Sequence, residues 1–469
     1  GLSVTQVTAS QYTINLATVT GSTGAYVFTL TAAGSGITDT ATNAFAVDAS
    51  DAFTVDVTAP TADIVDVTPD PRNTNAGVVT INFDEDVTGV TIDDFSLTRD
   101  AANVDISGLT VTTLSASQYT IDLATVTGTD GAYVFTLTAA ASGITDTATN
   151  ALAGNASDAF TVDVTAPTAD IVDVTSDPRN TSAGVVTINF NENVTGVSIG
   201  DLSLTRDAAN VDLSGLTVTQ VTASQYTIDL ATVTGTAGAY VFTLTAAASG
   251  ITDTATNAFV ADASDSFTVD TTAPTADIVD VTPDPRNTSA GVVTINFTEN
   301  VSGVSIGDFS LTRDAANVDI SSLAITTVSA SQYTIDLSSV TGTDGAYVFT
   351  LTAAASGIAD TATNALAGDA SDAFTVDVTA PTADIVDVTP DPRNTNAGVV
   401  TINFSEDVSG VSIGDFSLTR DAANVDISGL TVTTISATQY TIDLSTVTGT
   451  AGAYLLTLTA TGSNIQDGV

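Results

Sequence analysis

A proline-centred segment recurs every 107 residues, and it constrains the fold of this chain more than any other feature. The segment reads Phe-Thr-Val-Asp-Val-Thr-Ala-Pro-Thr-Ala-Asp at residues 160–170, and its prolines are Pro60, Pro167, Pro274 and Pro381. Before each proline, apolar and polar residues alternate as in a half-buried strand. Proline lacks the amide hydrogen that would continue a sheet ladder. The pattern therefore predicts a last strand, a three-residue Thr-Ala-Pro joint, and the first strand of the next module at 171–174.

This period divides the chain into a tandem array. We expect the back half of a module at 1–56, complete modules at 57–163, 164–270 and 271–377, and a module that lacks its last strand at 378–469. A module of 107 residues is long enough to bury a core of its own. Because Gly1 corresponds to Gly108 in mid-repeat, we expect the chain to be an internal slice of a longer protein.

Within the first complete module, short alternating runs are separated by turn residues, and no helical periodicity is present. The predicted strands are 62–67, 78–83, 95–99, one or two short strands within 104–114, and 118–123, 132–139 and 159–164. About seven such strands predict an all-β fold, an immunoglobulin-like β-sandwich, with a closed barrel as the weaker alternative. The residues expected to point into the core are Phe83, Phe95, Leu97, Tyr119, Ile121, Tyr133, Phe135, Leu137 and Phe160.

Several motifs carry a resemblance to a known family. They are Phe-Asp-Glu-Asp-Val-Thr-Gly at 83–89, Asp-Phe-Ser-Leu at 94–97, Ile-Thr-Asp-Thr-Ala-Thr-Asn at 144–150 and Val-Asp-Val-Thr-Ala-Pro-Thr at 162–168. Together they resemble the bacterial immunoglobulin-like repeats of large surface adhesins, over the whole chain. Asp-Gly-Ala-Tyr at 130–133 resembles the tyrosine corner of immunoglobulin-like folds, which implies that Tyr133, Tyr240 and Tyr347 bond to nearby backbone. That family usually has glycine where Thr149 stands.

The charge is strongly one-sided, with 54 acidic residues against 8 basic ones and a net charge of −46. Nucleic acid and anionic membranes are therefore poor partners. No apolar run approaches the ~18 residues of a membrane span, so we expect no membrane insertion. All but four of the acids are aspartate, which favours turns. The excess indicates either cation binding at loops or adaptation to high salt.

The four glutamates are the sharpest candidate for a site, because one stands at the same place in each module: Glu85, Glu192, Glu299 and Glu406. Residues before them differ, from Asp84 to Ser405. Sandwich topology places their loop, the loop around Asp146 and the incoming joint at one pole. Calcium takes six to eight oxygen ligands, so we expect a Ca²⁺ site at each joint. Its candidate ligands are Asp56, Glu85, Asp86 and Asp146; Asp163, Glu192, Asn193 and Asp253; Asp270, Glu299, Asn300 and Asp360; and Asp377, Glu406, Asp407 and Asp467.

The alternative is that these acids cap loop turns and stay solvated. A turn cap is the favoured role for Asp94, which precedes a strand in each module. Asp130 and Asp344 are replaced by Ala237 and Ala451 in the other modules, so that position is not an obligatory ligand. Arg72 lies in a loop facing the next module, where it either pairs with acids across the joint or forms a local surface contact. For Arg99 we favour the local contact.

Catalysis is not expected. Gly-Val-Ser-Ile-Gly at 196–200 matches the nucleophile elbow of serine hydrolases, but the chain has no histidine to act as base. The absence of cysteine excludes thiolate chemistry and zinc–thiolate sites, and it leaves the modules without disulfides.

The sequence thus favours a structural role: a rod or stalk segment of a giant extracellular or cell-surface bacterial fibre or adhesin, stiffened by calcium at its joints. Neighbouring modules, and like chains in a fibre, are the expected partners. Two alternatives remain, a self-associating filament or sheath subunit and an array that binds glycans or partner cells. The absence of tryptophan and the in-facing tyrosines argue against the glycan-binding array.

Overall fold

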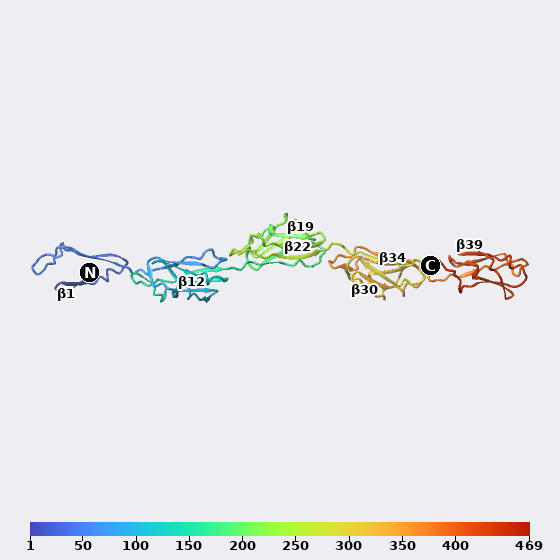
Figure 1. The fold of residues 1–469 in the computed structure, drawn as a ribbon, viewed down its shortest axis with the longest axis horizontal. Helices are drawn as coiled ribbons and strands as arrows, with labels where there is room; N and C mark the ends of the chain where they lie inside the picture. Colours follow the sequence, from blue (N-terminus) through green and yellow to red (C-terminus); the bar gives the residue numbers. More distant parts are fainter. The chain divides into compact units, whose positions relative to one another are not determined.

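The computed structural model describes residues 1–469 and consists of β-strands, turns and single turns of 3-10 helix. No helix has the length and hydropathy needed to cross a lipid bilayer. The chain forms two compact units. The first comprises Gly1–Val174, Gly184–Val233 and Tyr240–Ser266, and the second comprises Thr175–Ala183, Thr234–Ala239 and Phe267–Val469. Figure 1 colours the modules in sequence order, with β12, β22, β34 and β39 in successive copies.

The same strand pattern repeats in each module. In the module at 57–163 the elements are β5 (Ala62–Ile64), β6 (Val78–Phe83), β7 (Val87–Thr88), η1 (Ile92–Asp94), β8 (Phe95–Arg99), β9 (Ala102–Val104), β10 (Val111–Ser115), β11 (Gln118–Asp122), β12 (Gly131–Leu137), β13 (Thr145–Asp146) and β14 (Ala156–Val162).

The half module before it and the module after it follow this order. The half module contains β1 (Val4–Thr8), β2 (Gln11–Ile14), β3 (Gly24–Leu30) and β4 (Ala49–Val55). The next module contains β15 (Ala169–Ile171), β16 (Val185–Phe190), β17 (Val194–Thr195), η2 (Ile199–Asp201), β18 (Leu202–Arg206), β19 (Ala209–Val211), β20 (Val218–Thr222), β21 (Gln225–Asp229), β22 (Gly238–Leu244), β23 (Thr252–Asp253) and β24 (Ala263–Val269).

The last two modules repeat the order again. The third complete module contains β25 (Ala276–Ile278), β26 (Val292–Phe297), β27 (Val301–Ser302), η3 (Ile306–Asp308), β28 (Phe309–Arg313), β29 (Ala316–Val318), β30 (Ile325–Ser329), β31 (Gln332–Asp336), β32 (Gly345–Leu351), β33 (Ala359–Asp360) and β34 (Ala370–Val376). The last contains β35 (Ala383–Ile385), β36 (Val399–Phe404), η4 (Ile413–Asp415), β37 (Phe416–Arg420), β38 (Ala423–Val425), β39 (Val432–Ser436), β40 (Gln439–Asp443) and β41 (Tyr454–Leu458).

Each complete module is a sandwich of two antiparallel sheets. In the first, one sheet has the order β10-β11-β6-β5 and the other the order β14-β12-β8-β9. This is the strand order of immunoglobulin-like folds, with one short extra strand, β9. Two separate sheets also decide between the sequence-based alternatives, since a barrel would close into one sheet. The predicted immunoglobulin-like β-sandwich is therefore confirmed.

The core lies between the two sheets and is built from alternate residues of each strand. All nine residues that the sequence assigned to the core, from Phe83 to Phe160, are buried at 6% exposure or less. Aromatic rings stack across neighbouring strands, with Phe95 against Phe135 at 5.3 Å and Tyr133 against Phe160 at 5.4 Å between ring centroids. The module at 271–377 buries the equivalent residues, from Ile278 to Val376.

The predicted tyrosine corner is present. The Tyr133 hydroxyl donates a hydrogen bond to the Thr129 carbonyl at 2.7 Å, and Tyr347 donates to the Thr343 carbonyl at 2.8 Å. Each ring is buried, so this bond satisfies a hydroxyl that would otherwise lose its partner on leaving water. The corner thereby fixes the turn that leads into the long strand β12.

The strands next to the joint end earlier than predicted. The strand predicted at 62–67 ends at Ile64, and the strand predicted at 159–164 ends at Val162. Between β14 and β15 the joint spans 163–168 rather than three residues; its equivalents are 56–61, 270–275 and 377–382. The physical reason is competition for the backbone: the Asp163 N–H donates to the Arg72 carbonyl, and the Val67 N–H donates to the Asp158 carboxylate.

Replacing Leu137 with alanine should destabilise its module by about 2–5 kcal/mol, because the fully buried side chain leaves a cavity that the close-packed sheets fill only in part. Urea unfolding of the full chain should show an earlier transition for one module only. Val78→Ala, at an exposed position of the same module, serves as the control and should leave the transitions within about 0.5 kcal/mol of wild type.

Replacing Tyr133 with phenylalanine should cost about 1 kcal/mol, because the ring keeps its packing while the bond to the Thr129 carbonyl is lost. The measurement is the free energy of unfolding of the module from urea titrations. An unchanged free energy would contradict a stabilising role for the corner.

Candidate metal centre

Three carboxylates meet at each of the four joints. One comes from the joint itself and two from loops of the following module, and one oxygen of each lies within 4.8 Å of the others. We call each such group an acidic triad. The four triads are Asp56, Glu85 and Asp146; Asp163, Glu192 and Asp253; Asp270, Glu299 and Asp360; and Asp377, Glu406 and Asp467. The structure therefore brings together the three acids that the sequence analysis expected at each joint.

A two-residue strand pair places the two loop acids of a triad side by side. Strand β7 begins two residues after Glu85 and pairs with β13, so that Val87 lies opposite Asp146. This pairing requires a close backbone approach at Gly89, whose φ is +89° and where a Cβ atom would lie 2.6 Å from the Gly143 carbonyl oxygen. The same pair recurs as β17 with β23 and as β27 with β33.

The buried member of the triad is organised by its own turn. Asp146 is 3% exposed, and its carboxylate accepts hydrogen bonds from the backbone N–H groups of Ala148 and Asn150, both at 2.8 Å. The Asn150 side chain donates to the same carboxylate at 2.8 Å and to the Asp56 carbonyl at 3.0 Å. Asn150 thus links the turn to the preceding module.

Thr149 completes this turn with a φ of +71°, in the left-handed region that favours glycine. The structure shows that the threonine here adopts a glycine-like conformation. The same conformation is found at Thr256 and Thr363, with φ of +72° at both. The turn is therefore kept in all three complete modules in spite of the β-branched side chain.

The residue before each glutamate varies in identity but keeps one hydrogen bond. The Thr61 N–H donates to the Asp84 carboxylate at 2.7 Å, and the Thr168 N–H donates to the Asn191 side-chain oxygen at 2.7 Å. In the later joints, hydroxyls accept the equivalent bond: Thr298 from the Thr275 N–H and Ser405 from the Thr382 N–H. At this position, four different side chains each supply a hydrogen-bond acceptor for one backbone N–H of the joint.

A further carboxylate clamps some joints but not all. Asp130 accepts hydrogen bonds from the Val164 N–H, at 2.6 Å, and from the Thr165 hydroxyl, and Asp344 bonds in the same way to Val378 and Thr379. Ala237 stands at this place beside the 270–275 joint and offers no side-chain acceptor. The position is therefore a joint clamp rather than a triad member.

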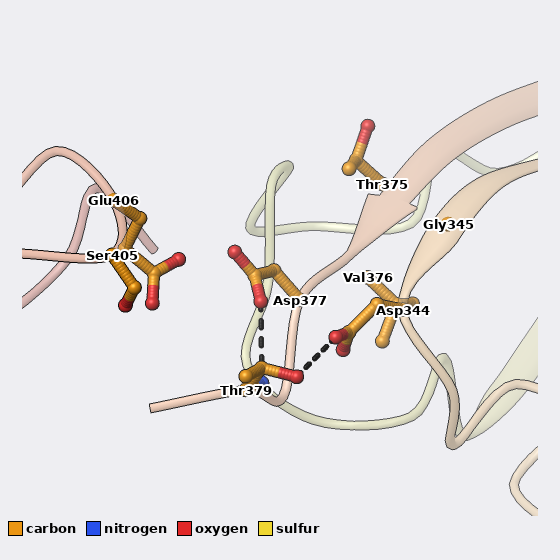
Figure 2. Close-up of a pocket in the computed structure, with 8 residues that line it drawn as sticks. All are labelled: Asp344, Gly345, Thr375, Val376, Asp377, Thr379, Ser405 and Glu406. Carbon is orange, nitrogen blue, oxygen red and sulfur yellow. Dashed lines mark hydrogen bonds between the residues drawn. The ribbon is translucent and has the colours of Figure 1, made fainter. Parts of the chain in front are cut away.

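Figure 2 shows the clamped joint at 377–382. Glu406 and Ser405 face Asp377 across a shallow pocket, and Thr379 lies between the carboxylates of Asp377 and Asp344. The Thr379 N–H donates to Asp377 at 3.2 Å while its hydroxyl donates to Asp344. Two carboxylates of the acidic triad thus line one solvent-accessible hollow from the two sides of a joint.

In each triad, the pKa of the glutamate is raised, first by burial and then by the neighbouring carboxylates. Partial burial raises the pKa of Glu85, and the charges of Asp56, Asp146 and Asp84 raise it further. Burial likewise raises the pKa of Glu192, followed by the charges of Asp163, Asp253 and the clamp residue Asp130. For Asp146, burial acts to raise the pKa, but hydrogen bonds from Asn150 and neighbouring backbone outweigh it, so the pKa is lowered. Hydrogen bonds thus favour the ionised form of Asp146, whereas burial and neighbouring negative charges disfavour the ionised forms of Glu85 and Glu192.

Two of the additional ligands predicted from the sequence do not join the triads. Asp86 and Asp407 are not among the carboxylates within 4.8 Å of one another. Asp86 follows Glu85 in the connection between β6 and β7. Its charge instead contributes, after burial, to the raised pKa of Tyr119. Asn193 and Asn300, at the same place in their modules, stay predictions.

Other predicted roles are resolved by hydrogen bonds. Asp94 caps its turn as expected, accepting from the Thr91 N–H at 2.7 Å, and Ser198 of the apparent nucleophile elbow bonds in the same way to Asp201. The Arg72 guanidinium bonds to Thr74 within its own loop, which favours the local alternative. The sequence analysis did not identify Asn150 as a residue of the joint or Asp130 as a clamp. The asparagine recurs at 150, 257 and 364, and this recurrence was the signal that could have identified it.

Comparison with known proteins adds the following. No protein-family model matches the chain, and no curated protein matches it. Among solved structures, a fragment of the titin I-band is 12% identical and covers 69% of this chain and 99% of its own, with a TM-score of 0.27. A structure of other titin domains is 14% identical, covering 68% of this chain and 99% of its own with a TM-score of 0.25.

A structure of native alpha-2-macroglobulin from Escherichia coli that spans domains MG0-NIE-MG1 is 10% identical and covers 59% of this chain and 97% of its own, with a TM-score of 0.19. Because these sequence identities and TM-scores are low, the fold is assigned from the strand order of each module.

The raised pKa of Glu192 predicts how stability depends on pH in the absence of divalent cations. The protonated form stabilises the fold below the ordinary value of 4.5, and this contribution is lost as pH rises through the higher folded pKa. Glu192→Gln should therefore melt like wild type at pH 4 and above wild type at pH 7, with chelator present. Thermal unfolding of the full chain measures both, and a lower melting temperature at pH 7 would contradict the repulsion.

Proposed function

We propose that this chain is a non-enzymatic spacer: a segment of the rod or stalk of an extracellular bacterial fibre or adhesin, in which calcium fixes the angle between modules. The observation that carries the proposal is the recurrence of an acidic triad at all four joints. Elsewhere in the modules, aspartates act singly as turn caps, as Asp94 and Asp105 do.

The position of the triad supports a role between modules. Asp163 belongs to the joint, whereas Glu192 and Asp253 belong to loops of the following module. An ion bound to all three would restrain rotation at the joint. Direct contacts across the joint include the bond from the Asn257 side chain to the Asp163 carbonyl at 2.7 Å.

The donor set suits calcium. Three carboxylates supply three to six oxygens, according to whether each binds through one oxygen or two, and water can supply the others. A divalent cation would also offset the repulsion that raises the pKa of each glutamate. The triads contain no nitrogen or sulfur ligand, which makes a zinc site of the usual kind a poor fit.

Burial of the tyrosines favours a spacer over a glycan-binding array. The two tyrosines of the first complete module, Tyr119 and Tyr133, are buried in the core at 6% and 1% exposure. They therefore offer no exposed ring on which a sugar could stack. The resemblance of the repeat motifs to adhesin modules is consistent with a location outside the cell.

The test compares the full chain in calcium and in chelator at fixed ionic strength. Calcium should raise the melting temperature, because it binds the folded state alone, and should increase the maximum dimension in small-angle scattering as the joints stiffen. At a calcium concentration 100 times the dissociation constant, each occupied site adds about 2.7 kcal/mol.

Two charge-matched variants sharpen the test. Replacing Glu85, Glu192, Glu299 and Glu406 with glutamine should abolish the gain from calcium. Replacing the exposed strand residues Asp63, Asp170, Asp277 and Asp384 with asparagine removes the same charge and should leave the gain intact. If wild type shows no change in melting temperature or maximum dimension, the acids are solvated loop caps.

A further inference from the structure

We propose that the edge strand β10, and its equivalents β20, β30 and β39, forms a lateral interface with an equivalent strand of a second copy of this chain. The proposal goes beyond a spacer role, which needs no second copy. It rests on how each module treats the four edges of its two sheets. A sheet edge presents unpaired backbone groups that can pair with another chain unless the protein protects them.

Three of the four edges are protected. Strand β5 has only three residues, with prolines at Pro60 and Pro69 on its flanks, and β9 has three residues between Asp100 and Asp105. Strand β14 is long, but the segment before β6 covers it. The Arg72 N–H donates to the Thr161 carbonyl at 3.0 Å, and the Thr161 N–H donates to the Asp70 carboxylate at 2.8 Å.

The fourth edge has none of these protections. Strand β10 has five residues without proline, glycine or charge, and it ends its sheet with β11 as its single partner. The neutral stretch extends well beyond the strand, since no residue from 106 to 121 is charged. The equivalent stretches 213–228, 320–335 and 427–442 are also free of charge. Of the other three edge strands, β5 and β14 each contain an aspartate and β9 is flanked by two, so the lack of charge distinguishes β10 among the edges.

A large aliphatic side chain stands exposed on the same edge. The register between β10 and β11 shifts between Thr113 and Ser115, and this bulge contains Leu114 at 59% exposure. Val221, Val328 and Ile435 take the same place in the other modules. A bulge commonly limits pairing at an edge, so we place the new ladder at 111–113 and its equivalents, with the bulge side chain packed beside it.

The edge fits a second copy of this chain better than another partner. An antiparallel pair of identical strands is self-complementary about a two-fold axis, so one surface supplies both halves of the contact. Elsewhere, two chains of net charge −46 repel each other, and the neutral edge is where they can approach closely. A cationic partner would instead be attracted to the acidic surface.

The size of one edge also argues for an array. A stable interface between two proteins buries on the order of 1,200–2,000 Å² in total, which a ladder of three residues does not reach. Each chain carries four such edges on linked modules, and linkage makes the second contact effectively intramolecular. Weak single contacts would therefore add up between two long chains while isolated modules stay apart.

Sedimentation velocity of the full chain in chelator tests the proposal independently of calcium. Wild type should form dimers that increase with protein concentration and with salt between about 0.05 and 1 M, because salt screens the repulsion between chains. An interface built on ion pairs would weaken with salt instead. Absence of dimers over this whole range would overturn the proposal.

A matched pair of variants locates the interface. Replacing Leu114, Val221, Val328 and Ile435 with lysine should abolish the dimers, because like charges would meet across the two-fold axis. Replacing Val78, Val185, Val292 and Val399, which are equally exposed on the inner strands β6, β16, β26 and β36, adds the same charge and should leave dimerisation unchanged. Because added lysine lowers the net negative charge, simple charge effects would strengthen association in both variants. Dimerisation of the Leu114 set at the wild-type level would overturn the assignment to this edge.

Discussion

The close approach of two loop backbones at Gly89 and Gly143 is the constraint on which each acidic triad depends. Without it, strands β7 and β13 could not pair, and Glu85 would not lie beside Asp146. Any side chain at Gly89 would collide with the opposing carbonyl oxygen. The acid of the joint then completes a triad whose other two acids already lie side by side at one end of the following module. Each module thus arrives with two carboxylates in place, and the preceding module supplies the third.

Period-two alternation is what made the fold predictable from sequence. Residues such as Tyr133, Phe135 and Leu137 alternate with polar neighbours, and sandwich burial follows directly from that pattern. Strand ends were harder to place, because they depend on competition for backbone groups by side chains distant in sequence. Asp158, for example, takes the Val67 N–H from 91 residues away. Alternation within one strand carries no information about such a bond.

The triads were predictable because immunoglobulin-like topology assigns loops to poles, so loop membership was enough to group Asp56, Glu85 and Asp146. The direction of a single side chain was not predictable at that level, and Asp86 was grouped with Glu85 although it is not among the carboxylates that lie within 4.8 Å of one another. Variation before the glutamate was also hard to interpret, because its shared property is acceptance of one backbone hydrogen bond. Side chains as different as Asp84 and Thr298 meet that requirement.

The short parallel bridge between Arg72 and Val162 has a mechanical consequence. Tension along the chain enters a module before β5 and leaves it after β14, so the two bridged segments are drawn in opposite directions along their length. The bonds from the Arg72 N–H to Thr161 and from the Asp163 N–H to Arg72 are then loaded in shear and must break together. A force that pulls on the ends of the chain therefore has to break these two hydrogen bonds before it can separate the core strands of the module.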